Sequence, residues 1–285
     1  MIHKLFYILI LLAVPVFSVS AHKTTPEFSL DGQYKILIVP GHDEESTGAV
    51  FRDTKEEDMN IKLGLFLANL FSASGGKKDP NWEVYITRDW DGYQEWLLDY
   101  LEANKENIAD FQEIISQTVT DEHAFNVVHL DAQAEMRTRL YGINKWADEN
   151  QIDAIIHIHF NDYPRKNPSQ RGDYKGFAIY FPESQFKNSF KSFALGSFIF
   201  QELFKNYPVS DYLPESLGLV PEQKLIAVGP NNSLDVPAIL IEYGYIYEIR
   251  FSAFWKRDAE LRKMSQATYN GLKNYFRYLE FIAKK

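Results

Sequence analysis

Four side chains that could bind a metal ion or move a proton lie in or directly after apolar runs of this 285-residue chain. His42 follows one run, His157 and His159 close a second, and Glu242 lies inside a third. Alternation along a strand would put His157 and His159 on one face. Each residue has an ordinary explanation, such as a loop histidine or a buried ion pair, because a carboxylate is costly to bury alone. Their occurrence together favours a chemical site.

The residue types indicate amide hydrolysis. Two imidazoles, one carboxylate and an open position for water are typical of a catalytic zinc site. Such a metal lowers the pKa of its water towards ~7 and polarises a carbonyl group. A nearby glutamate can then take a proton from the water and deliver it to the leaving amine. The chain contains no HExxH motif, so the site is not that of a zincin.

Two acids at the start of an expected helix, Glu56 and Glu57, are further candidates. Acids in a first helical turn usually complement the helix dipole or cap the helix, and Thr54 with Glu57 has the spacing of a capping box. Glu56, however, shares the inward face of the helix with Asn60 and Leu63. Glu56 could therefore point towards His42.

Elements that would position these residues alternate along the chain. Apolar runs predict strands, and helical periodicity predicts helices between them. Strands are expected at 34–40, 82–89, 152–161, 176–182 and 237–246, and helices at 53–76, 134–150, 189–207 and about 252–283. This order predicts a single three-layer α/β domain with a mostly parallel, twisted sheet flanked by helices. Ligands of such sheets collect at the carboxyl ends of the strands, where the candidate residues lie.

The N-terminal residues have the pattern of an export signal. Lys4 precedes a short apolar stretch, and small residues allow cleavage after Ala21. We therefore expect a signal peptide at 1–21, a leader at 22–33 and a catalytic domain at 34–285. The exported protein would reach the periplasm, the extracellular space or the cell wall, and after cleavage it would keep no stable membrane span. Without cleavage the apolar stretch would serve as an anchor. A net charge of −9 argues against nucleic acid as a partner.

Six blocks, in order, resemble the bacterial zinc-dependent N-acetylmuramoyl-L-alanine amidases, which cleave peptidoglycan. The blocks are "VPGHDEESTGA", "EEDMN", "VYITRDWD", "RLYGIN", "IIHIHFN" and "PAILIEYGYI". The resemblance covers about 34–249. It implies the zinc-dependent amidase fold and hydrolysis of the amide bond between N-acetylmuramic acid and L-alanine.

The resemblance also implies roles for individual residues. One Zn²⁺ would be held by His42, Glu56 and His159. Glu242 would be the general base and acid acting on a zinc-bound water. His157 stands where the family has a serine. Two substrate contacts are also expected, at Asn161 and Arg139.

Two alternatives remain at this stage. His42 and Glu45 form an H-x-x-E pattern, which is typical of zinc carboxypeptidases, and Glu45 would then replace Glu56 as the ligand. The substrate would become the C-terminus of a peptide. The chain could also be a non-catalytic relative that binds the cell wall.

A segment at about 90–133 is longer than the amidase pattern requires. It carries aromatic residues and histidines, and the spacing of Trp96 and Tyr100 predicts at least one helix packed on the domain. The residues of interest are Trp96, Tyr100, Phe111, Phe125, His123 and His129. Long insertions are often lids or binding surfaces. We expect either a helical hairpin without further function or a lid on which a regulatory protein could act.

Overall fold

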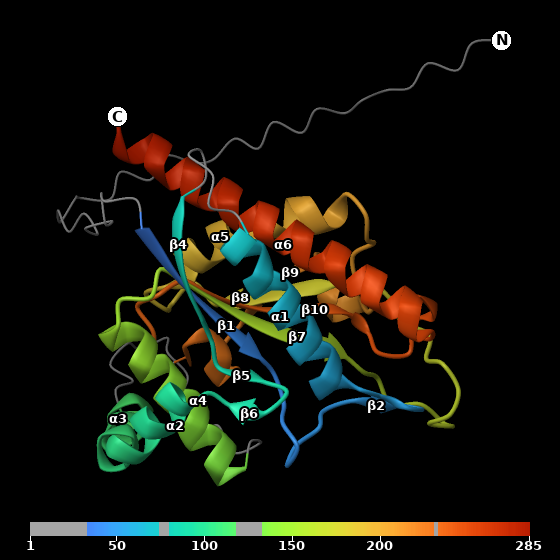
Figure 1. The fold of residues 1–285 in the computed structure, drawn as a ribbon, viewed down its shortest axis with the longest axis horizontal. Helices are drawn as coiled ribbons and strands as arrows, with labels where there is room; N and C mark the ends of the chain where they lie inside the picture. The colour runs from blue at the N-terminus through green and yellow to red at the C-terminus, as the bar shows by residue number, and fades with distance from the viewer. Residues whose placement is uncertain (1–32, 74–79, 118–132, 231–232) are drawn as a thin grey trace.

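A six-stranded sheet forms the middle layer of the protein (Figure 1). The computed structural model describes residues 33–73, 80–117, 133–230 and 233–285. The strands lie in the order β4-β1-β7-β10-β8-β9. Their bounds are β1 (Gln33–Pro40), β4 (Asn81–Ile86), β7 (Ala154–Asn161), β8 (Ala178–Pro182), β9 (Leu219–Glu222) and β10 (Ala238–Tyr245). Strands β4, β1, β7 and β10 are parallel, and β8 runs antiparallel to β10, which confirms the mostly parallel sheet.

Helices cover both faces of the sheet and complete the three layers (Figure 1). One face is covered by α1 (Glu56–Ala73), α5 (Ser189–Phe204) and α6 (Phe254–Ala283). The other face is covered by α4 (Ala134–Glu149) with α2 (Glu95–Ala103) and α3 (Lys105–Gln117) beside it. Ile36 and Ile38 belong to the core under α1, whereas Leu37 belongs to the core under α4. Burial of both faces explains why β1 reads as a continuous apolar run.

The register of the parallel strands brings the chemical residues to one edge. Val39 of β1 pairs with His157 of β7, and His159 pairs with Glu242 of β10. His42 follows β1 directly. Since parallel strands end at the same edge of a sheet, the first loop and the ends of β7 and β10 meet there.

The start of α1 differs from the prediction. The expected helix began near Asp53, but Thr54 and Lys55 form β3 (Thr54–Lys55), which pairs with β2 (Val50–Phe51). No capping box forms, because the Thr54 hydroxyl accepts a hydrogen bond from Arg257 and the Glu57 carboxylate lies 3.1 Å from Lys55 Nζ. The helix therefore begins at Glu56, where the chain leaves this small hairpin.

Short strands and 3-10 helices lie between these elements. They are β5 (Arg88–Asp89), β6 (Gly92–Tyr93), η1 (Leu213–Glu215), η2 (Ile226–Val228) and η4 (Ile249–Phe251). No helix in the described ranges is long and apolar enough to cross a membrane.

Helices α2 and α3 are the described part of the insertion. Trp96 packs on Trp146 of α4 with ring centroids 4.3 Å apart, and Leu97 is fully buried against the sheet. The predicted packing of this segment on the domain is therefore observed. Residues Phe125, His123 and His129 lie outside the described residues, as do the expected signal peptide and nearly all of the leader.

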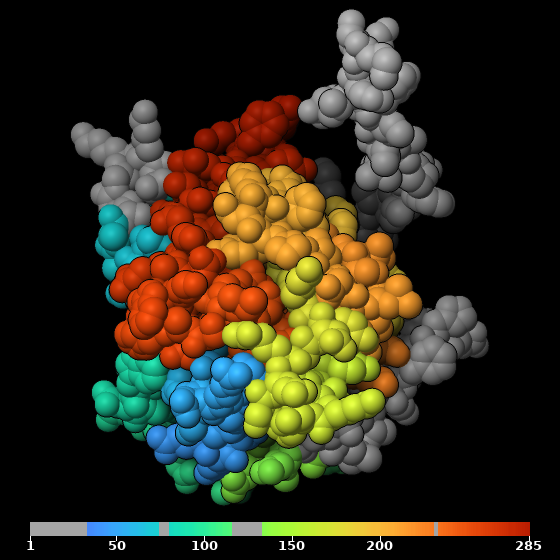
Figure 2. All heavy atoms as spheres, turned by 90° about the vertical axis from the view of Figure 1, so that its right-hand side faces the viewer, coloured from blue at the N-terminus to red at the C-terminus, as the bar shows by residue number. Residues whose placement is uncertain are grey.

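The loop that follows β7 lies over the β2–β3 hairpin. Figure 2 shows this face, with the yellow-green loop beside the blue segment near residue 50 and the orange-red start of α6. The Arg165 guanidinium lies over the rings of Phe51 and Tyr247, 5.4 and 4.8 Å from their centroids. These contacts hold the loop that follows Asn161 against Phe51 and Tyr247.

Candidate metal centre

His42 is held in a bend with left-handed backbone geometry, φ 62°. Its Nδ1 lies 3.1 Å from the Ser46 carbonyl oxygen, which leaves Nε2 towards the centre of the site. Arg88 donates a hydrogen bond to the His42 carbonyl oxygen. Asp43 accepts from the backbone N–H groups of Glu45 and Ser46 and closes the turn. The loop therefore presents the imidazole on a fixed backbone.

Glu56 is the first residue of α1 and joins both imidazoles. Its Oε2 lies 3.3 Å from His42 Nε2, and its Oε1 lies 3.0 Å from His159 Nδ1. The backbone N–H groups of Ala49 and Phe160 also donate to the carboxylate. Burial disfavours the charged carboxylate, but the hydrogen bonds and charges of His159 and His42 outweigh it and hold the Glu56 pKa well below its usual range.

Two glycines make room for this cluster. A Cβ at Gly41 would lie 2.2 Å from His159 Cε1 and Nε2. Gly48 has φ +70°, and a Cβ there would lie 2.5 Å from both Glu56 Oε2 and His42 Cδ2. Glycine removes both conflicts and tolerates the left-handed conformation. The two glycines of the block "VPGHDEESTGA" are therefore sterically required next to the cluster.

His42, Glu56 and His159 form a group that could hold a metal ion. One possible ligand atom from each of the three residues lies within 4.8 Å of the others. The His42 and His159 rings meet edge to face, with centroids 4.9 Å apart. Two imidazoles and one carboxylate are a donor set that suits zinc.

His157 lies on the same face of β7 as His159 but outside the group. Its side chain is 1% exposed. It makes a hydrogen bond to the backbone of Ala227. Burial, together with the nearby His159, lowers the pKa of His157 to about 3. Both histidines line one cavity, so the predicted shared face is observed.

Glu242 sits beside His159 on the adjacent strand. Its Oε2 atom is inaccessible to solvent and has no hydrogen-bond partner in the described part of the chain. Burial raises the Glu242 pKa well above its usual value, and the charges of Glu56 and Glu215 raise it further. Glu242 could ordinarily be explained as half of a buried ion pair, but it forms none of the ion pairs in the described part of the chain.

Glu215 is a site residue that sequence reasoning missed. It is 3% exposed and accepts hydrogen bonds at 2.7 Å from both Asn161 Nδ2 and the Tyr180 hydroxyl. The Ser210 and Tyr245 hydroxyls donate to its other oxygen. Glu215 lies in a polar loop without periodicity, so the sequence carries no signal that brings it to the strand ends.

The remaining candidates surround the centre. Arg139 of α4 forms an ion pair with Asp43, and Asn161 is bound to Glu215. Glu45 does not join the group: its side chain is 69% exposed, and its nearest cation is Arg139 at 4.0 Å. The carboxypeptidase-like ligand set is therefore not assembled, because Glu56 occupies the place that Glu45 would need.

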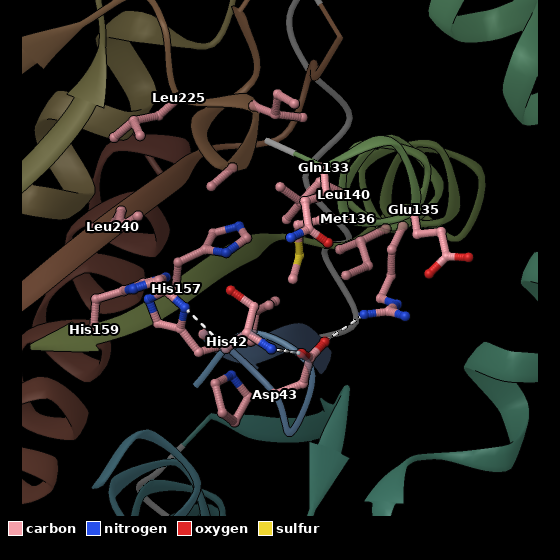
Figure 3. Close-up of a pocket in the computed structure, with 18 of the residues that line it drawn as sticks. His42, Asp43, Gln133, Glu135, Met136, Leu140, His157, His159, Leu225 and Leu240 are labelled. Carbon is pink, nitrogen blue, oxygen red and sulfur yellow. Dashed lines mark hydrogen bonds and ion pairs between the residues drawn. The ribbon is translucent and has the colours of Figure 1, made fainter. Parts of the chain in front are cut away.

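A cavity of about 820 Å³ opens beside the centre, between the sheet, α4 and residues 223–228 (Figure 3). His42, His157 and His159 lie along its floor. Its walls are largely apolar and include Met136, Leu140, Leu225 and Leu240. His42 and His159, two of the three metal-ligand candidates, therefore border a space that can hold a substrate.

Comparisons with known proteins agree with this geometry. The family model described as N-acetylmuramoyl-L-alanine amidase matches residues 36–274. The chain belongs to this amidase family. The resemblance of the six sequence blocks is thereby confirmed, and the chain is an N-acetylmuramoyl-L-alanine amidase acting on peptidoglycan.

Individual relatives of the amidase are distant. A protein of Buchnera aphidicola, provisionally assigned as an N-acetylmuramoyl-L-alanine amidase, is 26% identical and covers 88% of this chain and 98% of its own length. The CwlD amidase of Clostridioides difficile, solved with the GerS lipoprotein, is 20% identical, covers 86% of this chain and 99% of that chain, and has a TM-score of 0.52. Ami1 of Mycobacterium abscessus is 13% identical, covers 85% of this chain and 98% of that chain, and has a TM-score of 0.54. These structures support the shared fold.

Proposed function

We propose that this amidase is a zinc enzyme that cleaves the bond between N-acetylmuramic acid and L-alanine, with His42, Glu56 and His159 as the metal ligands. The observation that carries the proposal is the meeting of these three side chains beside Glu242. The donor set fits the metal: two nitrogen ligands and one carboxylate leave a position for substrate or water.

The proposed mechanism assigns the proton transfers to Glu242. When bound, zinc would supply Lewis acidity to the substrate carbonyl group and to the attacking water. Glu242 takes a proton from that water and returns it to the nitrogen of the departing L-alanine. A raised pKa suits this role, because a less acidic carboxyl group holds the transferred proton more readily before delivering it to the leaving nitrogen. A cation at Glu56 would offset one of the two charges that raise the Glu242 pKa.

Asn161 and Arg139 are proposed to contact the substrate. Glu215 fixes the Asn161 amide nitrogen, so the carboxamide oxygen has a defined direction. Arg139 borders the cavity and is oriented by its ion pair with Asp43 and by the Tyr93 ring, 4.4 Å from the guanidinium carbon. Both side chains are therefore preorganised, which favours binding.

One experiment tests the reaction. The purified protein is incubated with peptidoglycan, and the new chemical ends are identified. Free L-alanine amino groups on intact glycan strands are expected. Release of C-terminal amino acids would instead indicate a carboxypeptidase, and binding without any new ends would indicate a non-catalytic wall-binding protein.

We also propose that residues 1–21 are an export signal, that 22–33 are a leader, and that 34–285 are the catalytic domain. The support is the residue pattern of the N-terminus. The proposed location is the periplasm, the extracellular space or the cell wall. Sequencing the N-terminus of the exported protein tests this, and His22 is the expected first residue. An intact Met1 on the exported chain would contradict it.

The insertion is the proposed binding surface for a regulatory protein. Leu98 of α2 and Ile114 of α3 are 49% and 60% exposed. The CwlD amidase, which has the same fold, was solved in complex with a lipoprotein. Affinity purification from the native cell envelope should recover a partner with the wild type and lose it with a Leu98→Glu, Ile114→Glu variant. Equal recovery with both proteins would reject this surface.

A further inference from the structure

A separate cavity of about 240 Å³ lies beside the first turns of α1. It shares no lining residue with the large cavity beside the metal centre. Two exposed aromatic side chains line it, Trp90 at 52% and Phe254 at 60% exposure. Exposed apolar surface that is rimmed by polar residues is typical of a binding site. We call this cavity the aromatic groove.

The fold holds both aromatic rings of the groove in place. Trp90 lies in the tight turn between the paired strands β5 and β6, and this hairpin lies beside the start of α1 (Figure 1). Phe254 is the first residue of α6, and Lys62 Nζ lies 4.4 Å from its ring centroid. Lys62 is itself bound to Asp258 at 2.7 Å. The rings are therefore preorganised, which lowers the entropic cost of binding.

The charged groups of the groove disfavour an anionic ligand. Its three cations already have partners in the protein: Lys55 with Glu57, Lys62 with Asp258, and Arg257 with the Thr54 hydroxyl. The carboxylates of Asp53 and Asp58 also line the groove, and neither accepts a side-chain hydrogen bond within the described part of the chain. Two open carboxylates suit a ligand that brings hydroxyl or amide N–H donors.

Aromatic rings beside carboxylate acceptors match the two sides of a sugar ring. The flat face of a pyranose presents C–H groups with small positive partial charges, and the face of an aromatic ring is negative. The edge of the same sugar presents hydroxyl groups, and an N-acetylated sugar adds an amide N–H. Peptidoglycan, on which this amidase acts, has a glycan strand built of N-acetylated sugars.

The aromatic groove uses the same elements as the candidate metal centre. Thr54 and Lys55 line the groove and directly precede Glu56. Arg88, in the hairpin that carries Trp90, donates to the His42 carbonyl oxygen. A polymer that is cleaved at the centre can therefore reach the groove along the same edge of the sheet.

We propose that the aromatic groove binds the glycan strand of peptidoglycan, at sugars beyond the one that carries the cleaved amide. Trp90 and Phe254 are the stacking surfaces, and Asp53 and Asp58 accept hydrogen bonds from the hydroxyl and acetamido groups. The placement of the strand rests on the proposed function, since it takes the cleaved bond to lie at the metal centre.

Binding of a sugar without peptide tests the groove independently of hydrolysis. The probe is tetra-N-acetylglucosamine, titrated into the purified protein by calorimetry. Trp90→Ala and Phe254→Ala should each weaken binding by about 10-fold, a cost typical of losing an aromatic anchor. Trp90→Phe keeps a ring and should keep most of the affinity. Phe190→Ala is the matched control: this side chain at the start of α5 is 81% exposed and lies outside the groove lining.

The acceptors are tested in the same titration. An Asp53→Ala, Asp58→Ala variant should bind about 10-fold more weakly or worse, because hydrogen bonds to charged groups are lost. Absence of binding by the wild type overturns the proposal, as does wild-type affinity in both Trp90→Ala and Phe254→Ala. Equal weakening in Phe190→Ala also overturns it, because the effect would then not belong to the groove.

Kinetics on two substrates separates the groove from the proposed reaction. On peptidoglycan with long glycan strands, Trp90→Ala should raise KM by about 10-fold and leave kcat near the wild-type value, since only uniform binding is lost. On a single N-acetylmuramoyl-peptide the two proteins should behave alike. A wild type that binds the tetrasaccharide through Trp90 and Phe254 but cleaves neither substrate supports the groove and refutes the reaction. Cleavage without binding of the tetrasaccharide supports the reaction and refutes the groove.

Discussion

Glu56 is the residue on which the candidate centre depends, because its two carboxylate oxygens face two different imidazoles. Two backbone N–H groups, from Ala49 and Phe160, orient it. These contacts explain why an acid in a first helical turn is not a cap here. They also favour Glu56 over Glu45 as the carboxylate ligand, since Glu45 points to solvent and towards Arg139.

Replacement of Glu56 tests the ligand set directly. Glu56→Gln keeps the shape and one acceptor oxygen but loses the charge. Loss of an outer partner of a metal ligand typically costs 10–100-fold in metal affinity, so loss of a ligand should exceed about 100-fold. Glu45→Gln is the matched control and should keep wild-type affinity. Zinc titration by competition with a chelating dye measures both, and the reverse ranking would favour the carboxypeptidase-like ligand set.

Glu242→Gln tests the proton transfer. The amide keeps the volume of the side chain and removes its basicity, so kcat on peptidoglycan fragments should fall by about 10²–10⁴-fold. Zinc content, measured by atomic absorption, should stay near that of the wild type because Glu242 lies outside the ligand group. A variant with wild-type turnover would eliminate Glu242 as the general base.

At the scale of elements, the strongly patterned segments were predictable and the site loops were not. Strands β1, β7 and β10 are long apolar runs because both faces of the sheet are covered, and each was expected. β9 reads "LVPE", too short and too polar to be recognised. The predicted start of α1 was wrong, because Thr54 and Lys55 pair with the strand β2 and this pairing overrides the capping pattern.

The site residues divide in the same way, into those on patterned strands and those on irregular loops. His42, His159 and Glu242 end or occupy recognisable strands, so their convergence follows from parallel topology. Glu215 reaches them from a 3-10 turn some 27 residues before Glu242. Its position depends on the path of the connection between β8 and β9, which pair in parallel. The local sequence does not predict that path.

Asp148 near the end of α4 links stability to pH. Its carboxylate accepts a hydrogen bond at 3.1 Å from the Asp235 N–H, yet burial and the charge of Asp235 raise its pKa to about 6. The ordinary value is about 3.9, so between about pH 4 and pH 6 the unfolded chain is ionised at this residue while the folded chain keeps the proton. The folded state binds more protons, and the free energy of unfolding must fall as pH rises through this window.

Asp148→Asn should remove that dependence. We expect the wild type to lose on the order of 1–3 kcal/mol more than the variant between about pH 4 and pH 7, as measured by urea unfolding. Asp110→Asn on the exposed surface of α3 is the control. Parallel pH profiles for the wild type and Asp148→Asn would show that Asp148 titrates normally.

The proposed metal would connect three elements of the folded molecule, and one of its ligands, His159, lies 103 residues after Glu56 in the chain. His42 belongs to the loop after β1, Glu56 to the start of α1, and His159 to β7. These ligands are brought together only in the folded chain. Binding should therefore stabilise the folded state as a whole, because a ligand that binds only this state shifts the unfolding equilibrium.

Zinc should consequently raise the melting temperature. At a free concentration 100 times the Kd, the stabilisation is about 2.7 kcal/mol. For a domain of this size, about 2–4 °C per kcal/mol converts it to a rise of roughly 5–10 °C. Differential scanning calorimetry of chelator-treated protein, with and without added zinc, measures the shift. Magnesium should have little effect, because two imidazoles suit zinc better than a hard oxygen-seeking cation. Glu56→Gln should lose most of the shift while Glu45→Gln keeps it. An equal rise in both variants would place the bound zinc elsewhere on the protein, since the shift would then not depend on the carboxylate that joins β1, α1 and β7.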